Sequence, residues 1–178
     1  SSLDAPVSGW DTGAINGTLS IMAWGEQSIF DEVLELFNHL WKSVVYIWDA
    51  GTGQSTKMAN QIGIAGNMIG LCESLLYAER AGLDIEKTID VLRAGGANNW
   101  GMQNLAPRIV DKEFDTFFFV KHFVKDMRIA LDECRRMNLT LPGLSLVHDL
   151  YSQMLAYEEW DLGLHALINS LKRMNNIK

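Results

Sequence analysis

A lysine and two polar amides occupy one face at the start of a predicted long helix. The lysine is Lys57, and Asn60 and Gln61 follow it three and four residues later. Residues at these spacings lie on the same side of a helix. A lysine near low-dielectric surroundings loses its charge readily and can exchange a proton at neutral pH. The pattern therefore predicts a site in which Lys57 transfers a proton.

A second candidate is the glycine-rich segment near the N-terminus. Ser8 lies beside Gly9 at the end of a predicted strand. A serine hydroxyl next to a glycine amide can hold a carboxylate without a formal positive charge. On spacing alone, a hairpin loop with no binding role is the alternative interpretation.

The glycines before Lys57 raise the possibility of a dinucleotide-binding turn. Gly51 and Gly53 follow a strand-like run and precede a helix. The dinucleotide fingerprint needs a third glycine, where this chain has Thr56, and a second strand within a unit of about 30 residues. The sequence instead continues as helix, so we reject a dinucleotide-binding role for this turn.

The composition is that of a globular protein with one sizeable core. Of 178 residues, 48% are hydrophobic, and the net charge of −7 argues against nucleic-acid binding. Cys72 and Cys134 have neither metal-ligand nor disulfide spacing, which favours a reducing, cytoplasmic location. The apolar stretch 62–78 is short for a membrane span and contains Asn67 and Glu73, so we expect a buried helix and no membrane partner.

The periodicity predicts a small mixed segment followed by helices. Strands are expected at 3–7, 18–24 and 44–48, with a helix at about 26–42. The later helices are expected at 53–81 with Gly82 as C-cap, at 85–93, from Asn98 or Asn99 toward 105, and at 118–138, 143–157 and 162–174. The fold class is therefore mainly α, with a first domain at 1–49 and an all-helical second domain at 50–178.

Three glycines interrupt the first long helix at spacings of three and four. Gly63, Gly66 and Gly70 each cost about 1 kcal/mol of helix stability relative to alanine. We expect close backbone packing against another helix to explain them. Together with the aromatic run 117–119, this stripe predicts a homodimer or a larger homo-oligomer.

Three motifs, in this order, resemble those of the β-hydroxyacid dehydrogenase family. They are Asp4-Ala-Pro-Val-Ser-Gly9 continuing to Gly17-Thr-Leu-Ser-Ile-Met22, then Gly51-x-Gly53-x-x-x-Lys57-x-x-Asn60, and Lys125-Asp126-Met127. The family includes 3-hydroxyisobutyrate dehydrogenase, tartronate semialdehyde reductase and glyoxylate reductase, with 6-phosphogluconate dehydrogenase as a distant relative. The likeness covers essentially the whole chain. It implies a 6-phosphogluconate dehydrogenase C-terminal-like helical domain, preceded by a small β-α-β remnant of a truncated Rossmann domain.

The resemblance implies a role for each candidate residue. Lys57 matches the catalytic lysine, which exchanges a proton with the substrate hydroxyl while hydride passes between that carbon and the nicotinamide of NAD or NADP. Ser8 and Gly9 match the loop that binds the substrate carboxylate. Asn60, with Gln61 beside it, matches the residues that orient the substrate and the lysine.

The third motif carries a cofactor role and, at first sight, a metal-binding spacing. Lys125 matches a family lysine placed near the cofactor. His122 and Asp126 lie four residues apart on the same predicted helix, a spacing that can bind metal. With no third ligand in reach, we expect a solvated face and no metal there.

Three bulky residues stand where the family usually has glycine. They are Trp10, Trp24 and Phe117. Their bulk either narrows the substrate pocket or marks a site that has drifted from catalysis, and the residues themselves leave both alternatives open.

The sequence thus predicts the substrate-binding and catalytic half of a nicotinamide-dependent 3-hydroxyacid dehydrogenase, 3-hydroxyisobutyrate-like, which is inactive alone. The alternative is a non-catalytic helical oligomerisation or interaction module that retains the family fold. Lys57, Ser8 and Asn60 favour the enzyme, whereas the missing nucleotide-binding half and Trp10 favour the module. NAD and NADP both stay open, because the residues that read the ribose lie in the missing half.

Overall fold

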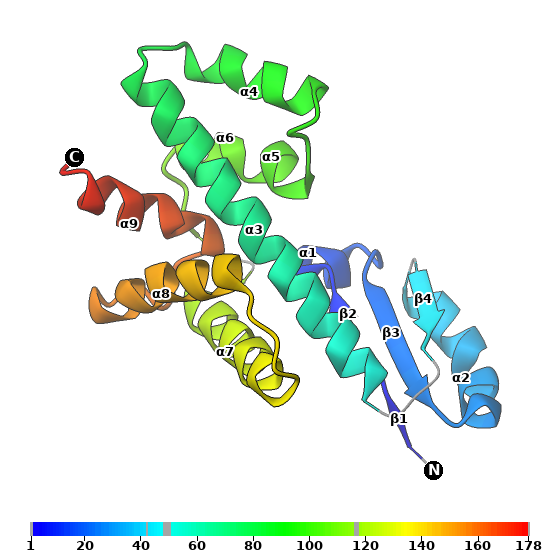
Figure 1. Cartoon of the computed structure of the whole chain (residues 1–178). Coiled ribbons are helices and arrows are strands. Elements are labelled where there is room, and N and C mark those ends of the chain that lie inside the picture. The colour runs from blue at the N-terminus through cyan, green and yellow to red at the C-terminus, as the bar shows by residue number, and fades with distance from the viewer. Residues whose placement is uncertain (1, 42, 48–50, 116–117, 178) are drawn as a thin grey trace. The chain divides into compact units, whose positions relative to one another are not determined.

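The computed structural model describes residues 2–41, 43–47, 51–115 and 118–177. The chain divides into two compact units, Ser1–Gln61 and Ile62–Lys178. The first unit holds a small sheet and its helices, and the second is helical (Figure 1). This confirms the mainly α prediction with a small β-containing segment in front.

The sheet of the first unit is built around β3 (Ser20–Gly25). Both β1 (Leu3–Asp4) and β2 (Val7–Ser8) pair with it antiparallel, and β4 (Ser43–Tyr46) pairs with it parallel. β1 and β2 keep one continuous register along β3, so they are two halves of the predicted strand. The break lies at Ala5-Pro6, because proline has no N–H to donate to the ladder.

One helix of the first unit is absent from the sequence-based prediction. The segment after Ser8, expected to be a glycine-rich turn, contains α1 (Trp10–Ile15). This helix packs tightly against Leu19, because a Cβ on Gly13 would lie 2.6 Å from Leu19 Cδ2. Trp48, at the end of the predicted strand 44–48, lies outside the described residues.

A small apolar core holds this unit together. Helix α2 (Gln27–Leu40) buries Phe30 against the β3 residues Ile21 and Ala23. The Phe30 ring also packs against Tyr46 of β4, with ring centroids 4.7 Å apart. β3 is thereby covered by α2 and fixed between its strand neighbours.

Helix α3 (Thr52–Arg80) begins in the first unit and continues into the second. It ends as the sequence predicts: Gly82 has a φ of +71°, and the Leu83 N–H bonds to the Ala78 carbonyl at 3.0 Å. A left-handed glycine in this position closes the last helical turn. Among the described residues, none of the helices combines the length and the apolar character needed to cross a membrane.

The glycine stripe of α3 is open within this chain. Gly63, Gly66 and Gly70 are exposed, and no described atom lies within 4 Å of a Cβ built on any of them. Within the described chain, no other helix packs closely against this face of α3. Close packing against a helix of a second copy stays a prediction.

The helices of the second unit follow the predicted order. They are α4 (Ile85–Ala94), α5 (Trp100–Asn104), α6 (Ala106–Val110), α7 (Val120–Arg136), α8 (Pro142–Ala156) and α9 (Leu167–Met174), the last preceded by the short 3-10 turn η1 (Leu164–Ala166). Asn99 caps α5 by accepting a bond from the Met102 N–H at 3.0 Å. The separate helix α6 was not predicted, and it carries Pro107 in its first turn, where proline is well tolerated.

One part of the core of the second unit lies where α8 packs against α7 and α9 (Figure 1). Phe123 and Tyr151 are fully buried and meet edge to face, with ring centroids 5.1 Å apart. The Tyr151 hydroxyl donates to the Leu164 carbonyl at 2.5 Å, so the buried phenol is satisfied.

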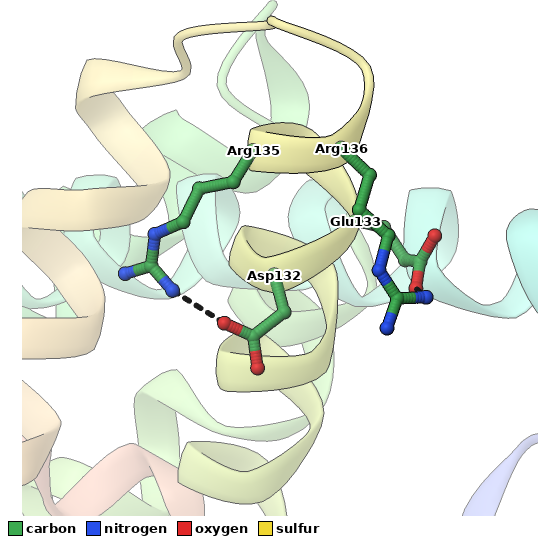
Figure 2. Close-up of polar contacts among 4 residues, drawn as sticks. All are labelled: Asp132, Glu133, Arg135 and Arg136. Atoms are coloured by element: carbon green, nitrogen blue, oxygen red, sulfur yellow. Dashed lines mark hydrogen bonds and ion pairs between the residues drawn. The ribbon is translucent and has the colours of Figure 1, made fainter.

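The outer face of α7 is charged. Figure 2 shows two ion pairs near its C-terminal end, Asp132 with Arg135 and Glu133 with Arg136. Each pair joins residues three apart on the exposed surface of the helix. Such pairs belong to a solvated face and add little stability.

Candidate functional site

The predicted catalytic lysine lies beside the predicted carboxylate loop. Lys57 Nζ donates to the Val7 carbonyl oxygen at 2.8 Å, across 50 residues of sequence. Val7 immediately precedes Ser8 and Gly9 on the same chain segment. Within the first unit, folding therefore brings two of the separated motifs together.

Gly9 is required by the shape of this loop. Its φ is +126°, in the region that favours glycine, and a Cβ there would lie 2.8 Å from Leu19 Cδ2 and 3.3 Å from Leu19 Cα. Ser8 is half-buried and pairs with Ser20 across the antiparallel ladder. The serine hydroxyl is thus carried on a strand end whose backbone position is fixed.

The two amides that follow Lys57 bond to each other. Asn60 Nδ2 donates to Gln61 Oε1 at 2.9 Å. Gln61 is buried, with 1% of its surface exposed, while Asn60 is half-buried. The buried amide therefore holds the orientation of Asn60, which lies one helical turn after Lys57.

Sequence reasoning missed the residues that seat the start of α3. The Asp4 carboxylate accepts a bond from Trp24 Nε1 at 2.7 Å and bonds from Gln54 Nε2 at 2.9 and 2.7 Å. A Cβ on Gly53 would lie 2.4 Å from Trp24 Cδ1 and 2.7 Å from the Met22 carbonyl oxygen. Asp4 and Gly53 belong to the sequence motifs and could have been singled out from them, whereas nothing in the sequence indicates that Gln54 bonds to Asp4.

The three bulky departures from the family pattern differ in their settings. Trp10 has a φ of 57°, a left-handed conformation that costs a non-glycine residue about 1–2 kcal/mol. Trp24 donates to Asp4 and covers Gly53. Phe117 lies outside the described residues. The backbone at Trp10 thus keeps a conformation suited to glycine, while Trp24 is built into the structure.

Lys125 belongs to the second unit and has a local partner. Its Nζ lies 2.9 Å from Asp126 Oδ1, with about half of the lysine side chain exposed and Asp126 nearly buried. The neighbouring His122 contacts the Phe118 and Phe119 rings. Among the described residues, no group of three or more His, Cys, Asp and Glu side chains could hold a metal ion.

Cys72 and Tyr151 are two reactive side chains of the second unit that belong to its core. Burial raises the pKa of the Cys72 thiol far above its ordinary value, so it stays protonated. Burial likewise raises the pKa of Tyr151 well above its ordinary value. Neither group has the lowered pKa that an activated nucleophile needs.

Comparison with known proteins places these motifs in a family. The family profile described as NAD-binding of NADP-dependent 3-hydroxyisobutyrate dehydrogenase matches residues 51–171, more than half of the chain. The chain belongs to the 3-hydroxyisobutyrate dehydrogenase family. A second profile, the NAD binding domain of 6-phosphogluconate dehydrogenase, matches residues 1–48. Both profiles describe nicotinamide dinucleotide binding, which supports NAD or NADP as the cofactor, and the resemblance seen in the sequence is confirmed.

Two curated relatives match nearly the whole chain. The Arabidopsis thaliana protein named probable 3-hydroxyisobutyrate dehydrogenase-like 1, mitochondrial, is 46% identical over 99% of this chain and 52% of its own length. The uncharacterized oxidoreductase YkwC of Bacillus subtilis is 45% identical over 93% of this chain and 57% of its own length. The chain thus spans a little over half the length of these curated relatives.

A solved structure supports the same family assignment. The Mycobacterium tuberculosis 3-hydroxyisobutyrate dehydrogenase, in a structure with L-serine, is 28% identical with a TM-score of 0.86. The match covers 96% of this chain and 60% of that one. The fold described above is therefore the corresponding part of the family fold.

Proposed function

We propose that this chain is the substrate-binding and catalytic half of a nicotinamide-dependent 3-hydroxyacid dehydrogenase, with Lys57 as the proton-transfer group. The observation that carries the proposal is the bond from Lys57 Nζ to the Val7 carbonyl at 2.8 Å. It holds the lysine next to Ser8 and Gly9, the residues expected to bind a carboxylate. A proton-transfer group and an anion-binding loop are the two parts that oxidation of a hydroxy acid requires.

The substrate is a small hydroxy acid bound at this corner of the first unit. The Ser8 hydroxyl and the Gly9 N–H hold its carboxylate, and the positive end of the α3 dipole favours an anion. Lys57 Nζ takes the proton of the substrate hydroxyl in oxidation and returns it in reduction. Asn60, held by Gln61, orients the substrate and the lysine.

The cofactor contributes hydride acceptance and donation when bound. Lys125 suits contact with its anionic groups, because its half-exposed ammonium lies on the first turns of α7. Within the described residues, the turn at Gly51 leads into a helix of 29 residues and then into α4, without the second strand of a dinucleotide cradle. We therefore propose that the chain alone is inactive and that most cofactor contacts come from an upstream nucleotide-binding half.

The second candidate function is a non-catalytic oligomerisation or interaction module. The exposed glycine face of α3 favours it, since Gly63, Gly66 and Gly70 leave room for a close neighbour. Assembly into a homodimer or larger remains a proposal that is compatible with both functions. A cytoplasmic location also remains a prediction, based on the free, buried Cys72 and Cys134.

A chimera separates the two functions. The part of the Bacillus subtilis YkwC protein that precedes the match to this chain is placed before residue 3, to supply the proposed nucleotide-binding half. We expect NAD- or NADP-dependent oxidation of 3-hydroxyisobutyrate or of a related hydroxy acid. Lys57→Ala should lower kcat by about 10²–10⁴-fold with little change in cofactor affinity, because loss of a proton-transfer group weakens the transition state most.

Two further variants define the role of the lysine. Lys57→Arg should not restore activity, because a guanidinium stays protonated and cannot accept the hydroxyl proton. Lys87→Ala is the matched control, since Lys87 is an exposed lysine on α4. Ser8→Ala should act chiefly on KM, by removing one hydrogen bond to a charged group worth about 1.5–3 kcal/mol. Full activity of Lys57→Ala across pH 6 to 9 would contradict the proposal and leave the module as the better account.

A further inference from the structure

The carboxylate of Asp4 joins three elements of the first unit. Asp4 lies on β1, and Trp24 on β3 donates its indole N–H to Asp4 Oδ2 at 2.7 Å. Gln54, in the first turn of α3, donates to both carboxylate oxygens, at 2.9 and 2.7 Å. The half-buried side chain of Asp4 therefore connects β1, β3 and the start of α3.

The same face of α3 carries Lys57. Gln54 and Lys57 lie three residues apart, so their side chains leave the helix on one side. Gln54 bonds to Asp4 and Lys57 bonds to Val7, and in both pairs the partners are 50 residues apart in the sequence. These two attachments lie along one face of α3, so both contribute to the rotation of its first turns about the helix axis.

The indole of Trp24 also sets how closely α3 approaches the sheet. A Cβ on Gly53 would collide with Trp24 Cδ1 at 2.4 Å and with the Met22 carbonyl at 2.7 Å. Glycine at this position thus lets the helix rest directly on the ring that donates to Asp4. Distance and rotation of the first helical turn are both determined at this point.

We propose that Asp4 is a positioning residue for Lys57, held in place by Trp24 and Gln54. Asp4 acts through the helix and touches no reacting atom. Its bonds keep the first turn of α3 at the rotation that presents Lys57 Nζ to the Val7 carbonyl beside Ser8. The inference rests on the proposed function in taking Lys57 as the proton-transfer group.

The test measures the reactivity of Lys57 in the 178-residue chain itself. Acetylation by a water-soluble N-hydroxysuccinimide ester is followed at each lysine by mass spectrometry. Asp4→Ala should raise the labelling rate of Lys57 by about five- to tenfold, because the loss of charged hydrogen bonds depopulates the arrangement in which Nζ is held. Lys87, which is exposed, serves as the internal standard and should not change.

A matched control removes the same kind of bond elsewhere in the unit. Gln27 Nε2 donates to Asp31 Oδ1 at 2.7 Å on α2. Asp31→Ala should leave the Lys57 rate unchanged. Asp4→Asn should keep it close to the original, because the new amide still accepts from Trp24 and can pair with a turned Gln54 amide.

Gln54→Ala decides the question if Asp4→Ala does not fold. Alanine favours a helix, and Gln54 is exposed, so this variant keeps the fold while releasing the helix from Asp4. It should also raise the Lys57 rate. An unchanged Lys57 rate in folded Gln54→Ala or Asp4→Ala, as judged by circular dichroism, would overturn the inference. A chimera inactive on every hydroxy acid would instead count against the proposed function, since labelling requires no turnover.

Discussion

The two units of this chain are held together in different ways. The second unit buries large side chains such as Phe123, Tyr151 and Met154, none of which is exposed. The first unit has a smaller core around Ile21 and Phe30, and polar bonds to residues 50 positions away hold the start of its helix α3.

This difference suggests that one kind of interaction stabilises the fold and another fixes the positions of the site residues. Apolar burial is strong but non-directional, whereas a hydrogen bond fixes distance and angle. The proposed catalytic residues lie in the unit whose helix start is fixed by polar bonds and by one glycine contact. We infer that the second unit supplies most of the stability and that the first unit supplies the geometry of the site.

The largest expected effect on stability comes from a substitution in the core of the second unit. Phe123→Ala removes a fully buried ring that packs edge to face on Tyr151, and should lower the free energy of unfolding by about 3–5 kcal/mol. Tyr77→Ala, at a side chain that is 74% exposed, is the control and should change it by less than about 0.5 kcal/mol. Urea unfolding followed by circular dichroism measures both. Equal effects of the two substitutions would show that the buried rings do not contribute specially to the stability of the second unit.

Two glycines of α3 should respond with opposite sign. Gly53→Ala places a methyl group against Trp24 and the Met22 carbonyl and should destabilise by about 1–3 kcal/mol. Gly63→Ala enters open space on the same helix and should stabilise by about 0.5–1 kcal/mol. Thermal unfolding of the two variants compares them directly. A neutral Gly53→Ala would mean that the start of α3 is not seated on Trp24.

His165 should make the second unit sensitive to acid. Burial lowers the pKa of this histidine from its ordinary 6.5, although its Nε2 lies 2.7 Å from the Glu113 carbonyl, and nearby Arg108 lowers the pKa further. As the pH falls below 6.5, the unfolded chain binds a proton that the folded chain does not. Stability should therefore fall with acidification from that point, by at most about 1.4 kcal/mol per pH unit from this one group.

Urea midpoints between about pH 5 and pH 8 check the His165 prediction, because this range spans the unfolded histidine's titration. The slope should flatten in His165→Gln. The exposed His39 provides the control, and His39→Gln should keep the original slope. A slope that survives in His165→Gln would assign it to other groups.

The smallest effect is expected on the charged face of α7 (Figure 2). Asp132→Ala removes the ion pair with Arg135, whose side chain is 75% exposed. The free energy of unfolding should change by less than about 0.5 kcal/mol, and added salt should reduce the difference. A loss of more than about 1 kcal/mol of unfolding free energy at low salt would contradict this expectation and show that the exposed ion pair stabilises the second unit.

The sequence by itself determined most of the helices and the residues of the proposed site. Long segments of helical period or helical length predicted α3, α7 and α8. Local signals predicted the Gly82 C-cap and an N-cap at Asn98 or Asn99, of which the structure uses Asn99, because capping depends on residues a few positions apart. The motifs named Lys57 and Ser8 by type and order.

Tertiary structure alone decided how those residues meet. One partner of Lys57 is the Val7 carbonyl, and a backbone carbonyl cannot be recognised from the residue type. The bonds to Asp4 join positions 20 and 50 residues away, and no local periodicity encodes such pairs. For the same reason, the sequence did not tell which glycines of α3 are closely packed. Gly53 is in tight contact and Gly63 is open to solvent, although both are glycines on one helix. The type of a residue limits which groups can pack against it, but the folded chain determines which groups actually do.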